Sequence, residues 1–191
     1  MISLDSVRRR VRFRSALPLV LAGGLALLVP MLAPESLAGG QAPSFRLRDL
    51  DGHVAELDRL RRQGPVVIEF WATWCTPCRA ALAELAATQR EHADCGLTVL
   101  AVSMDGPRNA AKVKPYATRE RLPFRVVIDL DGRMEQLYQV RQLPTTVLID
   151  TSGAIVTTQV GYRAGDATMR DRVAALCGSQ GSAADSAATA R

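Results

Sequence analysis

The chain has 191 residues, 48% of them hydrophobic and 5% aromatic, with a formal net charge of +5 at pH 7. This length suits one globular domain with an ample core and leaves no room for a second full domain. Five of the 24 basic and two of the 19 acidic residues lie in the first 38 positions. The remaining 19 basic and 17 acidic residues give a net charge of only +2, which offers nucleic-acid binding no support.

Residues 1–38 have the pattern of an export signal. Five arginines precede an apolar run at residues 16–33, and Ser36-Leu37-Ala38 is typical of a cleavage site. The apolar run is also near the lower length limit for spanning a bilayer, so a cleaved signal peptide and a retained inner-membrane anchor both fit. We expect the rest of the chain to lie in the periplasm or an equivalent extracytoplasmic space, where disulfides are stable.

The segment after this leader begins as a hairpin and continues as alternating strands and helices. Residues 45–47 and 54–57 flank an Asp-Gly turn, which predicts the hairpin. The alternation that follows favours parallel strands joined by crossover helices. The predicted strands are 66–71, 97–103, 124–128, 145–149 and 155–161, and the predicted helices are 76–92, 109–120, 134–138 and 166–176.

The domain predicted from these elements covers residues 39–177. Residues 178–191 are small and polar, with Ser, Ala and Gly dominating. Such a segment buries too little apolar surface to order itself, so we expect a disordered tail.

Two cysteines stand where the strand 66–71 passes into the helix 76–92. Cys75 is expected at the start of this helix, where unpaired backbone N–H groups and the positive end of the helix dipole favour thiolate, so we interpret Cys75 as an exposed nucleophile. Cys78, one turn later, can attack any mixed disulfide that Cys75 forms, and the two can close a disulfide with each other. The pair is a predicted redox switch, and we expect neither a dissociable cofactor nor a metal.

Glu69 interrupts the otherwise apolar strand just before the two cysteines. A buried carboxylate is costly unless it is paired or protonated, so we expect burial to raise the pKa of Glu69. We interpret Glu69 as the group that passes a proton to and from Cys78 as mixed disulfides form and break. The alternative is a strand residue whose side chain reaches solvent or a lysine.

These motifs together resemble the thioredoxin fold and, more narrowly, the TlpA/ResA group of exported thioredoxin-like proteins. The resemblance covers about residues 41–177 and is carried by Ala-Pro-Ser-Phe at 42–45, Phe-Trp-Ala-Thr-Trp-Cys at 70–75 and Pro-Thr-Thr-Val-Leu-Ile-Asp at 144–150. It implies an α/β fold with a central mixed sheet flanked by helices, an added N-terminal β-hairpin, and an inserted helix and strand.

The resemblance also implies an extracytoplasmic thiol-disulfide oxidoreductase that reduces client proteins and takes electrons from a membrane thiol carrier of the DsbD/CcdA type. In such a protein the Leu143–Pro144 bond is cis, and the backbone of Leu143 is left to pair with a client strand. The expected client-binding residues around the cysteines are Trp74, Thr76, Pro77, Leu143, Pro144 and Thr145. We expect a monomer, attached to the membrane through residues 16–33 if the leader is retained.

Cys95 and Cys177 are expected to form a structural disulfide. In a thioredoxin fold the helices that they end cover the same face of the sheet and run away from the active site, so the resemblance implies that their C-termini are neighbours. An oxidising compartment permits the bond. The alternative is a pair of buried free thiols.

Several functional alternatives remain open. The same dithiol acts as an oxidase if its reduction potential is high, and two thiolates also suit a copper(I)-handling or oxidase-assembly module. A thiol peroxidase is disfavoured because it needs a threonine where Ala72 stands. An acidic residue common in the group is replaced by Ala81, which weakens a role in cytochrome c biogenesis.

Overall fold

The computed structural model describes residues 39–189, with side chains described to residue 178. The export signal or anchor predicted for residues 1–38 lies outside the described residues. Within the described part of the chain, no helix has the length and apolar character needed to cross a membrane.

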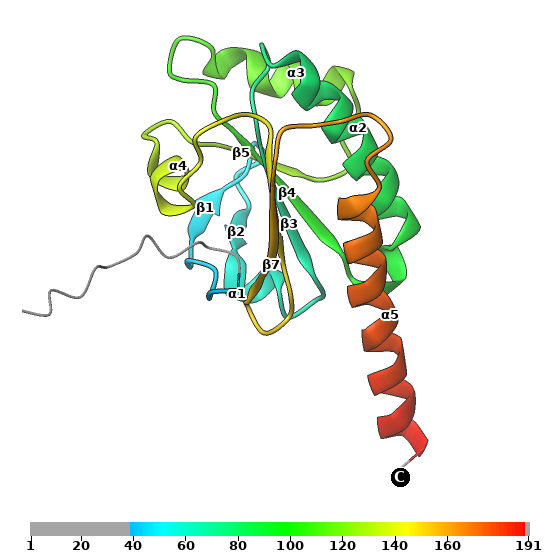
Figure 1. Ribbon diagram of the computed structural model, residues 1–191. Coiled ribbons are helices and arrows are strands. Elements are labelled where there is room, and N and C mark those ends of the chain that lie inside the picture. Colours follow the sequence, from blue (N-terminus) through cyan, green and yellow to red (C-terminus); the bar gives the residue numbers. More distant parts are fainter. Residues whose placement is uncertain (1–38, 190–191) are drawn as a thin grey trace, which may run out of the picture. The chain divides into compact units, whose positions relative to one another are not determined.

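A five-stranded mixed sheet forms the centre of the domain, in the order β5-β4-β3-β6-β7 (Figure 1). The strands are β3 (Val66–Trp71), β4 (Thr98–Ser103), β5 (Arg125–Ile128), β6 (Thr145–Ile149) and β7 (Ile155–Val160). β3, β4 and β5 pair in parallel, whereas β6 is antiparallel to β3 and β7 is antiparallel to β6. Every residue of β3 and β6 is buried, because other elements cover both faces of the sheet. The predicted thioredoxin-like α/β fold is confirmed.

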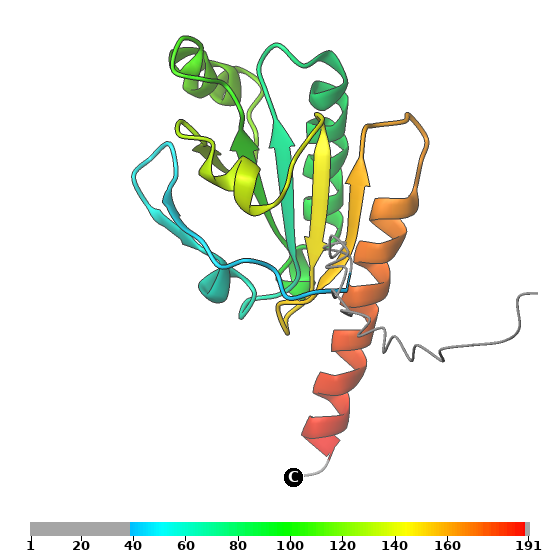
Figure 2. The same cartoon turned by 60° about the vertical axis from the view of Figure 1, so that its left-hand side comes forward.

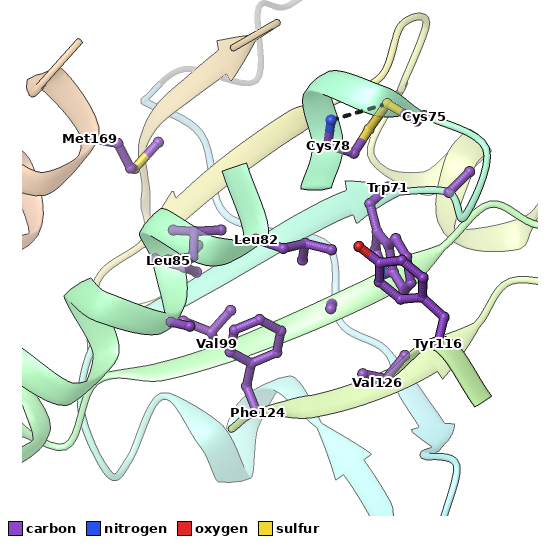
Figure 3. Packing of buried hydrophobic residues seen from close by; sticks show 14 of the residues in the cluster. Trp71, Cys75, Cys78, Leu82, Leu85, Val99, Tyr116, Phe124, Val126 and Met169 are labelled. Carbon is purple, nitrogen blue, oxygen red and sulfur yellow. Dashed lines mark hydrogen bonds between the residues drawn. A yellow bond between two sulfur atoms is a disulfide. The ribbon is translucent and has the colours of Figure 1, made fainter. Parts of the chain in front are cut away.

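Three helices build the core on one face of the sheet. They are α2 (Thr76–Glu91), α3 (Val113–Arg119) and α5 (Thr168–Thr189), and the short 3-10 turns η1 (Ala93–Cys95) and η2 (Ala110–Lys112) precede β4 and α3. Leu82, Tyr116 and Val173, one from each helix, pack in one buried cluster with Val67 and Trp71 of β3. Figure 3 shows part of this cluster. α3 and β5 are the inserted helix and strand, and β5 forms one edge of the sheet.

The N-terminal hairpin and two short helices cover the opposite face of the sheet (Figure 2). These elements are β1 (Arg46–Arg48), β2 (Val54–Glu56), α1 (Leu57–Leu60) and α4 (Arg133–Leu137). The hairpin is confirmed, but α1 was not predicted, and the expectation that Leu57 continues the strand is wrong. Leu57 and Leu60 are both buried, and their three-residue spacing lets a single helical turn point both side chains into the core.

α5 is longer than the predicted helix of residues 166–176 and continues to Thr189. Met169 and Val173, one turn apart, are buried and hold its first part against the sheet. The segment 178–191 contains no large apolar residue with which the helix could pack further. The loose tail predicted there stays a prediction.

A disulfide joins Cys95 and Cys177, whose Cα atoms are 5.4 Å apart. α2 and α5 run side by side along the sheet (Figure 1), which brings the two residues together. Their places differ slightly from expectation. Cys95 closes the turn η1 rather than ending α2, and Cys177 lies within α5 because that helix continues beyond it.

Loss of this bond should strongly destabilise the domain. The residues are 82 apart in sequence, and closing a loop of that length contributes about 4 to 5 kcal/mol in the chain-entropy model. We expect Cys95→Ser/Cys177→Ser to lower the free energy of unfolding by about this amount, as measured by urea denaturation. The matched control, Cys75→Ser/Cys78→Ser, opens a loop of only three residues and should lose about 1 to 2 kcal/mol. Equal losses in the two variants would contradict the prediction.

Candidate active site

Cys75 and Cys78 are joined by a disulfide at the N-terminus of α2, with their Cα atoms 5.3 Å apart (Figure 3). Cys75 is the N-cap residue, and the backbone N–H of Cys78 donates a hydrogen bond to its Sγ at 3.3 Å. Cys75 exposes 5% of its surface and Cys78 exposes none. Cys75 is therefore more covered than the exposed thiol we expected, because its sulfur is bonded to that of Cys78. A partner nevertheless meets Cys75 first, which supports its interpretation as the nucleophile.

A buried carboxylate fixes the loop that carries Cys75. Asp105 accepts hydrogen bonds from the backbone N–H of Thr73 at 2.8 Å and from its hydroxyl at 2.6 Å. The hydroxyl of Ser103, at the end of β4, donates to the same carboxylate at 2.9 Å. The sequence analysis missed Asp105. Its place just after a buried strand parallel to β3 was a usable signal, because parallel strands end at the same edge of a sheet.

Trp74 stands exposed beside the disulfide and separates two clefts. It exposes 61% of its surface. The cleft toward α3 has a volume of about 470 Å³, and the cleft toward the loop before β6 has a volume of about 330 Å³. Met104, Val140 and Leu143 line the second cleft. An exposed indole between two clefts is a surface that a partner chain can cover.

Thr76 and Pro77 form the start of α2 and are both exposed next to Cys75. Proline fits this position because the first N–H groups of a helix have no intrahelical partner and its backbone angle is preset for the helix. The hydroxyl of Thr76 accepts a hydrogen bond from the guanidinium of Arg79 at 3.3 Å. Both residues are therefore accessible at the surface beside Cys75.

The Leu143–Pro144 peptide bond is cis, as the resemblance implies. The residue after it, Thr145, donates its hydroxyl to the carbonyl of Gln142 at 2.7 Å and so ties the two sides of the bond together. Within the described residues, neither the N–H nor the C=O of Leu143 makes a backbone hydrogen bond. Because Leu143 also lines the cleft beside Trp74, its backbone is available to an added strand.

Glu69 is fully buried on the face of β3 that α2 covers. Val67 and Trp71 belong to the cluster that contains Cys78, and the alternation of side chains along a strand places Glu69 between them. Its Oε2 accepts a hydrogen bond from the hydroxyl of Thr146 at 2.6 Å, whereas Oε1 has no partner within the described residues. Thr146 had no predicted role.

Burial raises the pKa of Glu69 from 4.5 to about 8, although the hydrogen bond from Thr146 partly opposes the shift. The side chain reaches no solvent and makes no ion pair with a described residue, so the alternative of a solvent-facing strand residue is wrong. The carboxyl group can hold or release a proton near neutral pH.

This raised pKa predicts that the domain loses stability as the pH rises. Between about pH 4.5 and 8 the unfolded chain has released the proton of Glu69 while the folded chain still holds it, so raising the pH favours unfolding. At about 1.4 kcal/mol per unit of pKa, the free energy of unfolding should fall by roughly 3 to 5 kcal/mol across this window. Glu69→Gln should remove that fall. Urea denaturation at several pH values checks it, and parallel pH curves for the two proteins would contradict it.

Within the part of the chain that the structure describes, no group of three or more His, Cys, Asp or Glu side chains could hold a metal ion. Cys95 and Cys177 are bonded to each other, away from Cys75 and Cys78. The Cys75–Cys78 pair supports thiol-disulfide exchange, and the buried carboxyl group of Glu69 can exchange a proton near neutral pH.

Comparison with known proteins places this site in a family. A family model described as the AhpC/TSA family matches residues 38–158. The chain is 36% identical over 124 residues to the thiol-disulfide oxidoreductase ResA of Halalkalibacterium halodurans. The aligned part covers 65% of this chain and 69% of the relative. It is 34% identical over 152 residues to ResA of Geobacillus kaustophilus, with 78% and 86% covered. The chain belongs to the AhpC/TSA family, in its TlpA/ResA group.

A solved structure shows the same fold. The crystal structure of a putative thiol:disulfide interchange protein DsbE from Chlorobium tepidum has a TM-score of 0.68 and 29% sequence identity, and covers 73% of this chain and 97% of its own. The resemblance to the TlpA/ResA group drawn from the sequence motifs is confirmed.

Proposed function

We propose that this TlpA/ResA-group protein is a thiol-disulfide oxidoreductase that reduces the disulfides of client proteins outside the cytoplasm. The observation that carries the proposal is the Cys75–Cys78 disulfide at the start of α2, in which Cys75 is the more exposed residue. The free backbone of Leu143 and the exposed indole of Trp74 beside it supply a surface for a client segment. The names of the ResA relatives support the same activity.

The reaction begins with both cysteines reduced. The thiolate of Cys75 attacks one sulfur of the client disulfide, that disulfide breaks, and the other client sulfur leaves as a thiolate that takes a proton from water. Cys78 then gives its proton to the carboxylate of Glu69 and attacks the sulfur of Cys75. The bond between Cys75 and the client breaks, the second client thiolate leaves, and two electrons have passed to the client.

Glu69 is proposed as the proton acceptor of the second step and the proton donor of its reverse. Its burial on the α2 face, its raised pKa and the single hydrogen bond from Thr146 support this role. When a donor dithiol reduces the protein again, Cys78 leaves as a thiolate and takes the proton back from Glu69. No dissociable cofactor takes part in this cycle.

The electron donor is proposed to be a membrane thiol carrier of the DsbD/CcdA type. The leader pattern in residues 1–38 and the Cys95–Cys177 disulfide support an extracytoplasmic, periplasmic location. A leader retained as an inner-membrane anchor through residues 16–33 would hold the domain near such a carrier, where we expect it to act as a monomer. Ala81 stands in place of an acidic residue common in the group and gives a role in cytochrome c biogenesis no support.

The proposal is tested by the reduction potential of the Cys75/Cys78 couple, measured by equilibration with glutathione on residues 39–191. We expect a reducing value near the roughly −270 mV of thioredoxin, together with reduction of a protein disulfide in solution. A value near the roughly −120 mV of DsbA would instead make the protein an oxidase. Titration of the reduced protein with copper(I) tests the alternative of a copper-handling module, which requires tight binding by the two thiolates.

A further inference from the structure

Four basic side chains lie near the disulfide, and three of them line the two clefts beside Trp74. Lys112 and Arg119 line the cleft toward α3, and Arg141 lines the cleft toward β6. Arg79 follows Cys78 on α2 and lies close enough to α3 to act electrostatically on Tyr116. All four are exposed. We call Arg79, Lys112, Arg119 and Arg141 the basic rim.

Few carboxylates oppose the basic rim. Glu120 pairs with Arg119 at 3.0 Å, and Glu135 lines the cleft toward β6. Among the described residues, the other three cations of the rim form no ion pair with a carboxylate, and the amine of Lys112 donates to the neutral amide oxygen of Asn109 at 2.9 Å. Asp105 is buried and already bonded to its neighbours. Four cations therefore stand against two carboxylates at this site.

Arg119 of the rim is packed against the core of the domain. The guanidinium of Arg119 lies 5.2 Å from the ring of Tyr116, and that ring packs at 5.1 Å on Trp71 in the core. Figure 3 shows Tyr116 and Trp71 in the same cluster as the disulfide. The chain after residue 38 has a net charge of only +2, so a surplus of two positive charges beside the disulfide is a local concentration and not a property of the whole surface.

We propose that the client segment is extended and carries acidic side chains two residues before and after its reactive cysteine. This inference rests on the proposed function and specifies its substrate. A strand paired with the backbone of Leu143 would pass over Trp74. Because side chains alternate along a strand, those two residues before and after the reactive cysteine would share its side and point toward the two clefts. Carboxylates there meet Lys112 and Arg119, which raises the rate of encounter and fixes the orientation of the segment.

The test measures the first exchange step alone. Two peptides, identical except for Asp or Lys at the positions two residues before and after one cysteine, are each activated as a mixed disulfide with thionitrobenzoate. The thiolate of Cys75 in Cys78→Ser attacks the peptide sulfur, a Cys75–peptide bond forms, and coloured thionitrobenzoate leaves. The readout is the ratio of the two second-order rate constants. A general change in the reactivity of Cys75 cancels in that ratio.

In the Cys78→Ser background we expect the Asp peptide to react about tenfold or more faster than the Lys peptide at about 10 mM ionic strength, and the ratio to approach one at about 1 M. Lys112→Glu/Arg119→Glu should invert the preference. The control Arg59→Glu/Arg62→Glu makes the same change of net charge near α1, at the end of the sheet opposite to the disulfide (Figure 1). This control should keep the preference for the Asp peptide. If the reversed variant does not fold, Lys112→Gln/Arg119→Gln replaces it and should bring the ratio toward one.

A ratio near one in the Cys78→Ser background, or an equal change in the α1 control, would overturn the inference. Failure of the proposed function gives a different result, because it is measured as turnover of protein disulfides by the protein with both cysteines. If the protein turns over no protein disulfides but the ratio still depends on the basic rim, the reductase function is rejected and the preference of Cys75 for acidic peptides stands. Normal turnover with a ratio near one would reject only the acidic client.

Discussion

Cys78→Ser will arrest the protein as a covalent adduct with its client. Cys75 can still attack the client disulfide, but the thiol that displaces the client is gone. Intramolecular attack by a well-placed group has a very high effective concentration, so we expect turnover to fall by ~10³-fold or more. Non-reducing electrophoresis and mass spectrometry should show a one-to-one adduct through Cys75 that dithiothreitol releases.

Cys75→Ser is the matched control because it makes the same replacement of sulfur by oxygen, three residues earlier in the chain. Cys78 exposes none of its surface, so this variant should form no adduct and have no turnover. An adduct through Cys78 at a rate similar to that through Cys75 would show that the roles of the two sulfurs are wrongly assigned.

Glu69→Gln will slow the displacement step and change its pH dependence. In the natural protein this step requires ionised Glu69 to accept the proton of Cys78, so its rate should rise with pH and level off above about pH 8. Glutamine keeps the shape and can still accept the hydrogen bond from Thr146, but it cannot take a proton. We expect the rate at pH 7 to fall ~10²-fold, which is the lower end for general acid–base catalysis.

Rapid-quench measurements of the decay of the mixed disulfide at several pH values check this expectation. In Glu69→Gln the rate should follow only the ionisation of Cys78, without the inflection near pH 8. Glu91→Gln makes the same chemical change in an exposed residue at the far end of α2 and should leave the profile unchanged. An unchanged profile in Glu69→Gln would remove Glu69 from the mechanism and leave the two cysteines in place.

Local patterns in the sequence determined most of the architecture. The apolar runs at 66–71 and 145–149 and the helix that begins at Thr76 were predicted with bounds within a residue of those observed, because strand and helix periodicities are local. The short helix α1 escaped prediction because a single turn has too little periodicity to distinguish it from the end of a strand.

Some residues of the site could also be predicted from local patterns in the sequence, whereas others could not. The chemistry of Cys75 and Cys78 was predicted from their spacing and their place at the start of a helix, and that of Glu69 from its charge within an apolar strand. Asp105, Thr146 and the four cations of the basic rim come from separate elements, and the pairing of β3 with β4 and β6 and the docking of α3 bring them together.

The sequence by itself determined where most strands and helices lie, the pair of thiols and the titratable group in the strand before them, because each depends on neighbours along the chain, and the resemblance to the TlpA/ResA group implied the fold. Only the tertiary structure decided how far each sulfur is covered, which hydroxyl meets Glu69 and which charges face a client, because burial and electrostatic fields are sums over atoms that are distant in sequence.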